Sequence, residues 1–165
     1  MEDSLNCSIA PAIASDAYTI SAMSARLIEA GLPQSWTPWR VSKFIRNKDS
    51  VVLTARVDNA LAGFAIMHFK DREAHLNLLA VEPDYRRTGI GRSLVCWLEA
   101  SAVVAGTFLI SLEVRADNSD ALEFYADLGY RETGLIPRYY DDRFDAALLA
   151  RDLRVGGVTS DSNFP

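Results

Sequence analysis

The chain has 165 residues, 49% of them apolar and 24% charged, with a formal net charge of −5. These values are typical of one globular domain with a sizeable core. The acidic balance argues against a general affinity for nucleic acid or for an anionic membrane surface, because both require a basic face.

The N-terminal stretch MEDSLNCSIAP has no basic segment followed by an apolar one, so no secretory signal is expected. No apolar run approaches the roughly 18–20 residues that cross a bilayer. The two cysteines, Cys7 and Cys96, do not have the spacing of a metal or redox motif. We interpret them as plain thiols of a reducing compartment, and we expect a cytoplasmic protein without a metal.

In chain order, the apolar periodicity first predicts an amphipathic helix over residues 15–30. Thr37-Pro38 is a favourable N-cap and first-turn pair, so a second helix is expected to begin there. Two apolar runs that flank Asp58-Asn59-Ala60 predict a hairpin. The further expected elements are a strand at 75–81, a helix at 91–105, a strand at 107–114, a helix from 118–119 to Gly129, and strands at 130–136 and 144–153.

This order of elements predicts one α/β domain with a mixed sheet over residues 1–153, with a β-α-β unit in the middle. Residues 154–165 contain few apolar side chains and two adjacent glycines. We expect them to form a disordered C-terminal tail.

The stretch PDYRRTGIGRSLVCWLEA at 83–100 places three arginines, Arg86, Arg87 and Arg92, around Gly89 and Gly91 at the start of a predicted helix. A helix N-terminus presents unpaired N–H groups and a partial positive charge, and therefore attracts anions. Glycine lets the backbone turn sharply and approach a ligand closely. The turn is a candidate phosphate site, or simply a glycine turn before a core helix.

Two familiar phosphate motifs fail on spacing. A P-loop requires a lysine directly after its last glycine, and none follows here. A dinucleotide-binding turn requires a third small residue, where this chain has Leu94.

The segment LLAVEPDYRRTGIGRSLVCWLE resembles the acetyl-CoA signature of the GCN5-related N-acetyltransferase (GNAT) superfamily. The resemblance implies a single GNAT-like domain with a mostly antiparallel sheet and helices on both faces. It implies that backbone N–H groups from about Arg87 to Ser93 hold the pyrophosphate of coenzyme A. It also implies a bulged strand at Leu79–Val81 that pairs with the pantetheine arm, with the Val81 N–H polarising the thioester carbonyl. The matching positions are Leu79, Ala80, Val81, Pro83, Tyr85, Arg86, Gly89, Ile90, Gly91 and Leu94.

The C-terminal segment LEVRADNSDALEFYADLGYRETGLIPRYYDDRFDAALLARDL resembles the ribosomal-protein-alanine N-acetyltransferases, the RimI type. Two positions depart from that family. Leu78 stands where the family often has asparagine, and Phe144 stands where it has an acidic residue. Neither belongs to the acetyl-CoA signature, so both concern the acceptor.

Acetyl transfer to an amine requires a base for the amine and an acid for the leaving thiolate. Glu113 is a lone acid in the apolar strand FLISLEV, where a charge is costly unless it is used or paired, and the family has its base at the matching glutamate. An outward-facing edge residue is the alternative interpretation. Tyr125 is the candidate acid, with core packing as the alternative.

Three more residues acquire roles from the resemblance. Asn118 is a helix N-cap and also a candidate hydrogen-bond partner of the pantetheine arm. Tyr139 and Tyr140, on the loop between the last two strands, are candidates for one wall of the acceptor slot, or else surface aromatics of a hairpin tip. His68 and His75 have no partner at catalytic or metal spacing along the chain, and we interpret both as structural.

The leading functional hypothesis is an acetyl-CoA-dependent acetyltransferase that acts on a protein N-terminus, with a ribosomal protein as the candidate partner. An N-terminal amine has a pKa near 8 and a lysine amine near 10.4, so making the lysine neutral costs about 3–4 kcal/mol more at neutral pH. The alternatives are an acetyltransferase of a small amine or lysine side chain, and a non-catalytic acyl-CoA-binding module.

Overall fold

The computed structural model describes residues 6–156 of the chain. The elements in this part are β1 (Cys7–Pro11), a 3-10 turn (Ala14–Asp16), α1 (Ala17–Leu27), α2 (Pro38–Arg46), β2 (Ser50–Val57), β3 (Ala60–Lys70), β4 (Glu73–Val81), a second 3-10 turn (Pro83–Tyr85), α3 (Ile90–Val104), β5 (Leu109–Arg115), α4 (Ser119–Asp127), β6 (Arg131–Tyr140) and β7 (Phe144–Asp152). The expected tail beyond Gly156 lies outside the described residues.

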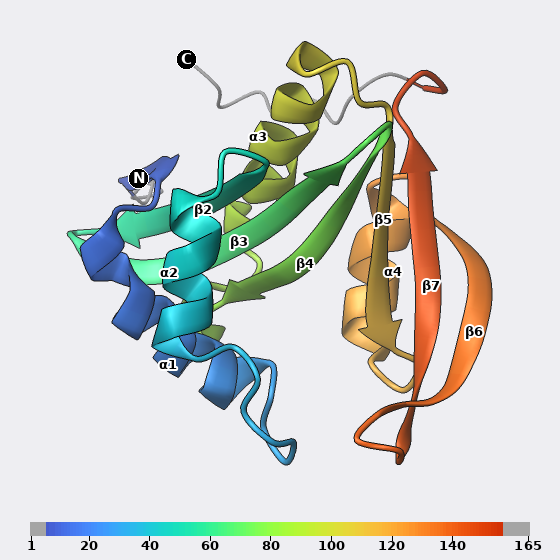
Figure 1. Ribbon diagram of the computed structural model, residues 1–165, viewed down its shortest axis with the longest axis horizontal. Coiled ribbons are helices and arrows are strands. Elements are labelled where there is room, and N and C mark those ends of the chain that lie inside the picture. The colour runs from blue at the N-terminus through green and yellow to red at the C-terminus, as the bar shows by residue number, and fades with distance from the viewer. Residues whose placement is uncertain (1–5, 157–165) are drawn as a thin grey trace.

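The seven strands form one sheet in the order β1-β2-β3-β4-β5-β7-β6. All neighbouring strands are antiparallel except β4 and β5, which are parallel and are connected through α3. Helices α1 and α2 lie on one face of the sheet, and α3 and α4 lie on the other (Figure 1). The predicted α/β domain with a mostly antiparallel sheet and helices on both faces is therefore confirmed.

Each face of the sheet has its own apolar core. Under α3 and α4, the core contains Leu94, Leu98, Ile110 and Leu112. Under α1 and α2, it contains Ile20, Val41, Phe64, Ile66 and Leu78.

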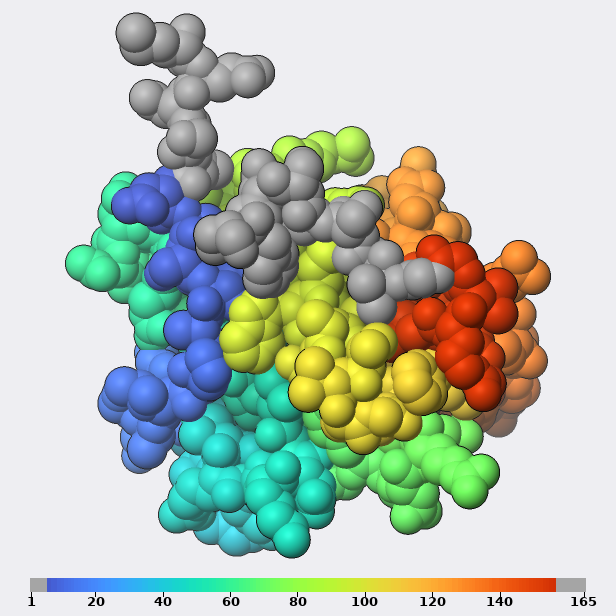
Figure 2. All heavy atoms as spheres, turned by 90° about the horizontal axis from the view of Figure 1, so that it is seen from above, coloured from blue at the N-terminus to red at the C-terminus, as the bar shows by residue number. Residues whose placement is uncertain are grey.

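Seen from the end at which β4 and β5 pair, β1 and α1 lie on one side of the molecule and β7 lies on the other, with α3 between them (Figure 2). Burial on both faces fixes which side chains of β4 and β5 point to which side.

Local sequence signals account for most of the element ends. Thr37 accepts a hydrogen bond from the Arg40 N–H and caps α2 as expected. Asp58 and Asn59 both adopt positive φ, as the two-residue turn of a hairpin requires. Gly129, with φ of 95°, ends α4.

The first strand, β1, was missing from the sequence prediction. It is five residues long, pairs only with β2 at the edge of the sheet, and ends at Pro11. A short strand with a proline gives a weak sequence signal, and proline is tolerated there because one side of an edge strand is unpaired.

A buried ion pair connects α3 to β7. Both Glu99 carboxylate oxygens accept hydrogen bonds from the Arg151 guanidinium at 2.9 Å, and the Tyr130 hydroxyl donates to the same carboxylate at 3.3 Å. The Glu99 side chain is fully buried. A buried carboxylate is tolerated only with such partners, so this cluster helps to fix α3 against the C-terminal half of the sheet.

We expect Arg151→Ala to lower the free energy of unfolding by about 3 kcal/mol, because it removes the cation that faces the buried carboxylate of Glu99. Urea denaturation measures this loss. The matched control is Arg154→Ala, which removes an exposed arginine paired with Asp152 and should change stability by less than about 1 kcal/mol. Equal effects of the two substitutions would contradict a stabilising role of the buried pair.

Candidate active site

The central feature of the site is the separation of β4 from β5. Their pairing consists of three residue pairs and ends at His75 and Ser111. Beyond this point the two strands diverge, as Figure 1 shows. Within residues 6–156, no strand pairs with this edge of β4 from Leu76 to Val81, so its backbone groups on that side are available to a ligand.

Two contacts show which residues of β4 direct their backbone toward this open edge. The Ala80 carbonyl lies toward β3, 2.8 Å from the position of a Cβ added at Gly63. The Val81 carbonyl instead accepts a hydrogen bond from Arg86 Nε at 3.1 Å. Because an antiparallel strand alternates the side to which its N–H and C=O groups point, Leu79 and Val81 both face the opening.

The bulge in β4 lies earlier than the resemblance implied. Pairing with β3 is regular through Leu79–Val81, and the register shifts between Leu76 and Leu78, so Asn77 is the extra residue. The expectation of a bulge at Leu79–Val81 is wrong by two residues. A bulge reverses the alternation of side chains and increases the twist. Leu76 and Leu79 therefore both face the core under α3.

The glycine turn joins this edge to α3. Gly89 is the N-cap residue, with φ of 89°, and Arg87 also has a positive φ, of 60°. The first N–H groups of α3 have no acceptor within the helix, so the turn offers the donors that an anion requires. The residues predicted to bind the cofactor from this turn, Arg86, Arg87, Gly89, Gly91, Arg92 and Ser93, are thus next to the open edge.

The two glycines are needed for different reasons. A Cβ added at Gly89 would meet no atom within 4 Å, so this position needs glycine for its positive φ. A Cβ at Gly91 would lie 3.3 Å from the Phe124 ring on α4. Gly91 therefore allows α3 to pack closely against α4, which sequence reasoning did not anticipate.

Helix α4 positions Asn118 and Tyr125. The Asn118 side-chain oxygen accepts a hydrogen bond from the Ala121 N–H at 3.1 Å, which confirms the N-cap interpretation. Tyr125 is 7% exposed, and its ring lies edge-to-face with Phe124 and Tyr130. Burial, and then the nearby Tyr140, raise the pKa of Tyr125 well above its usual value, so its hydroxyl keeps its proton at neutral pH.

Ser111 is the last residue of β5 that pairs with β4. Glu113 follows two residues later and points to the same face of the sheet as Ser111. Its carboxylate Oε2 is 2.7 Å from Nε2 of His75 on β4. The other ring nitrogen of His75, Nδ1, is 3.3 Å from the Ser111 hydroxyl. His75, which the sequence analysis interprets as structural, therefore has a partner that spacing along the chain does not reveal. The two residues are 38 positions apart, and the parallel register brings them together.

The tyrosines of the last hairpin lie close to Glu113. Burial, and to a smaller extent the negative charge of Glu113, raise the pKa of Tyr139 and raise that of Tyr140 to about 12. The two rings contact each other edge-to-face, with centroids 4.9 Å apart, and Tyr139 is 48% exposed. Tyr139 and Tyr140 thus lie near Glu113, and Tyr125 lies near Tyr140.

Phe144 occupies the position at which the related family has an acidic residue. Its ring packs against two arginine side chains at this end of the hairpin. The guanidinium of Arg115 lies 3.8 Å from the centroid of the Phe144 ring, and that of Arg143 lies 5.2 Å from it. Arg143 also donates a hydrogen bond to the Gly31 carbonyl at 2.6 Å. The β6–β7 hairpin is therefore connected to the loop between α1 and α2.

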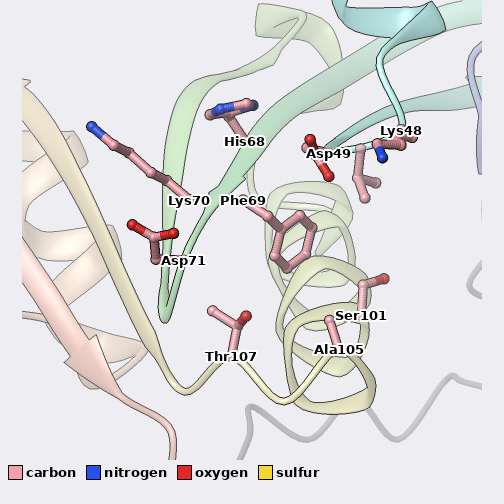
Figure 3. A pocket seen from close by; sticks show the side chains of 10 residues that line it. Lys48, Asp49, His68, Phe69, Lys70, Asp71, Ser101, Ala105 and Thr107 are labelled. Carbon is pink, nitrogen blue, oxygen red and sulfur yellow. The ribbon is translucent and has the colours of Figure 1, made fainter.

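A separate hollow of about 710 Å³ lies at the other end of β4 (Figure 3). It is lined by Lys48, Asp49, Val51, His68, Phe69, Lys70, Asp71, Ser101, Ala105 and Thr107. It contains none of the residues that the sequence selects for catalysis or cofactor binding, so its size alone does not make it the active site.

Within residues 6–156, no three histidine, cysteine or carboxylate side chains gather as a metal site would require. None of the helices in this range combines the length and apolar character needed to cross a membrane.

An open strand edge beside a glycine turn is the arrangement that the resemblance to the GNAT superfamily implies for binding acetyl-CoA. The family described as Acetyltransferase (GNAT) matches residues 17–130. The chain belongs to this family, and it is an acetyl-CoA-dependent N-acetyltransferase.

Two comparisons, one of sequence and one of structure, concern the ribosomal-protein-alanine type. The [ribosomal protein bS18]-alanine N-acetyltransferase of Escherichia coli K12 is 36% identical over 118 residues, which cover 68% of this chain and 80% of the relative. The crystal structure of the Escherichia coli ribosomal-protein-S18-alanine N-acetyltransferase superposes with a TM-score of 0.76 at 27% identity, covering 96% and 99% of the two chains.

A third comparison concerns the fold alone. The PaiA N-acetyltransferase of Thermoplasma acidophilum, solved in complex with coenzyme A, has a TM-score of 0.74 at 20% identity and covers 89% of this chain and 99% of its own. The chain is thus similar to the ribosomal-protein-alanine type in sequence and to coenzyme A-binding members in fold.

We expect Gly89→Val to weaken acetyl-CoA binding about tenfold or more. A β-branched residue strongly disfavours the positive φ of this N-cap position, and a distorted turn misplaces the N–H groups at the start of α3. Isothermal titration with acetyl-CoA measures the affinity.

The matched control is Gly106→Val, at the opposite end of the same helix. Gly106 also has a positive φ, of 77°, and open space around its Cα, so the strain is comparable but far from the turn. Acetyl-CoA affinity that is unchanged by Gly89→Val, or reduced equally by both substitutions, would show that the turn does not hold the cofactor.

Proposed function

We propose that the chain transfers the acetyl group of acetyl-CoA to the N-terminal α-amine of a protein, with Glu113 as the base and Tyr125 as the acid. The observation that carries the proposal is that the Glu113 carboxylate lies on β5 just beyond the point where β4 and β5 part, while Tyr125 on α4 is buried and keeps its proton. Direct transfer requires these two groups, one to accept a proton and one to supply it.

The residues that would hold acetyl-CoA fit its chemistry. The open edge at Leu79 and Val81 offers backbone donors and acceptors to an amide-containing arm, and the turn from Arg87 to Ser93 offers N–H groups to a pyrophosphate. Bound in this way, acetyl-CoA supplies an activated thioester. Asn118, at the N-cap of α4, is the remaining candidate contact of the arm.

The side chains divide the proton transfers between them. Glu113 accepts a proton from the incoming ammonium group, or from the amine as it becomes bonded to carbon. Tyr125 donates its hydroxyl proton to the sulfur that leaves. Because burial raises its pKa, the Tyr125 hydroxyl holds a proton at neutral pH that it can donate. The enzyme regains its starting state when Tyr125 takes up a proton and Glu113 releases one.

An N-terminal amine suits this arrangement better than a lysine amine. It is already partly neutral near pH 7, so one carboxylate is an adequate base. In this proposal Tyr139 and Tyr140, which lie near Glu113, form one wall of the acceptor slot, and a narrow slot would admit the end of a chain more readily than a side chain. The relatives of the ribosomal-protein-alanine type act on such an end.

We expect Tyr125→Phe to lower kcat tenfold or more while the Kd for acetyl-CoA changes little, because only the donated proton is lost. Tyr130→Phe is the matched control. It removes a hydroxyl from the neighbouring ring, 5.5 Å away, which bonds to Glu99 and does not face the opening. Steady-state coenzyme A release gives kcat, and an unchanged kcat in Tyr125→Phe would leave this tyrosine with a packing role only.

The acceptor class is tested with two peptides of one sequence. One has a free N-terminus and blocked lysines, and the other has an acetylated N-terminus and free lysines. We expect the first to give the higher kcat/KM, and a peptide with the N-terminal sequence of ribosomal protein bS18 to rank among the best. Faster turnover on the second peptide, or activity confined to polyamines, would favour the small-amine or lysine alternative.

A further inference from the structure

We propose that His75 is a positioning residue for Glu113, a role that rests on the proposed function of Glu113 as the base. Nε2 of His75 donates a hydrogen bond to Glu113 Oε2 across the last paired position of β4 and β5. The bond fixes one carboxylate oxygen and leaves Oε1 to meet the amine.

The register explains why this pair meets. His75 is directly opposite Ser111, and Glu113 follows two residues later on the same face of β5. The residue opposite Glu113 would lie two positions further along β4, where the strands have parted and Asn77 is bulged out. Glu113 therefore contacts His75 diagonally, at the closed end of the opening, rather than a partner of its own.

The carboxylate of Glu113 only accepts hydrogen bonds, so Nε2 of His75 must carry the hydrogen, and Ser111 is compatible with this. Its hydroxyl lies 3.3 Å from Nδ1 and can donate to that atom when the ring is neutral, or accept from it when the ring is charged. In both states Nε2 carries a hydrogen and points at Glu113. Ser111, His75 and Glu113 thus form a chain of hydrogen bonds that keeps the carboxylate in one orientation.

The position of the pair argues for a role beyond stability. The side chains of His75 and Glu113 are 34% and 22% exposed, and a partly exposed pair of this kind contributes little to folding. A flexible carboxylate in the same place would populate several rotamers, of which few direct an oxygen at the amine. Holding it in one rotamer raises the fraction of encounters that lead to reaction.

The experiment compares His75→Leu with His75→Gln. Leucine has a similar size but no donor, whereas the glutamine side-chain amide places an N–H near the position of Nε2. We expect kcat to fall about tenfold in His75→Leu, a partial loss of general-base catalysis, with the Kd for acetyl-CoA unchanged. His75→Gln should recover most of the lost rate. Circular dichroism and thermal unfolding confirm that both variants fold.

The matched control is His68→Leu. His68 is the cross-strand neighbour of His75 on β3, and it also bonds to a serine, Ser50, through Nδ1. It does not contact Glu113, and its replacement should leave kcat unchanged. A similar loss of kcat in both leucine variants would assign the effect to the sheet rather than to the carboxylate.

A double-mutant cycle with Glu113→Gln tests whether His75 acts through Glu113. In that background His75→Leu should change kcat less than about twofold, because the group it positions is gone. Full additivity, or no recovery in His75→Gln, would overturn the positioning role while the base assignment stands. Wild-type turnover in Glu113→Gln itself would overturn the base assignment and the positioning role together.

Discussion

The site depends on one constraint, which is that β4 and β5 pair over three residues and then part. A continuous sheet would satisfy every backbone group of both strands and leave no place for an amide-containing ligand. The bulge at Asn77 lies where the strands separate, and the added twist of a bulge carries one strand away from the other. The opening is therefore built into the register of β4.

Two faces of the sheet supply the two halves of the proposed chemistry. The glycine turn, α3 and Tyr125 belong to the face covered by α3 and α4. Alternation along β5 places Ile110, Leu112 and Val114 in that core, so Glu113 points to the opposite face, toward α1 and α2. The opening between β4 and β5 is the place where groups on the two faces of the sheet can act on one ligand.

Sequence reasoning predicted most of the fold because its signals are local. The cap at Thr37, the turn at Asp58 and Asn59 and the C-terminal glycine of α4 each depend on neighbouring residues. The bulge at Asn77 and the contact of His75 with Glu113 depend on pairing between distant strands, which periodicity along one strand does not reveal. The roles of Glu113 and Tyr125 in catalysis were suggested by family resemblance, and they remain predictions because position alone does not show proton transfer.

The tyrosines around Glu113 follow from the same geometry. Burial raises the pKa of Tyr125, Tyr139 and Tyr140, and the negative charge of Glu113 raises those of Tyr139 and Tyr140 further. They remain hydrogen-bond donors at neutral pH. In the proposed reaction, the amine meets the proton acceptor on one face of the sheet while the thiolate leaves toward the donor, Tyr125, on the other.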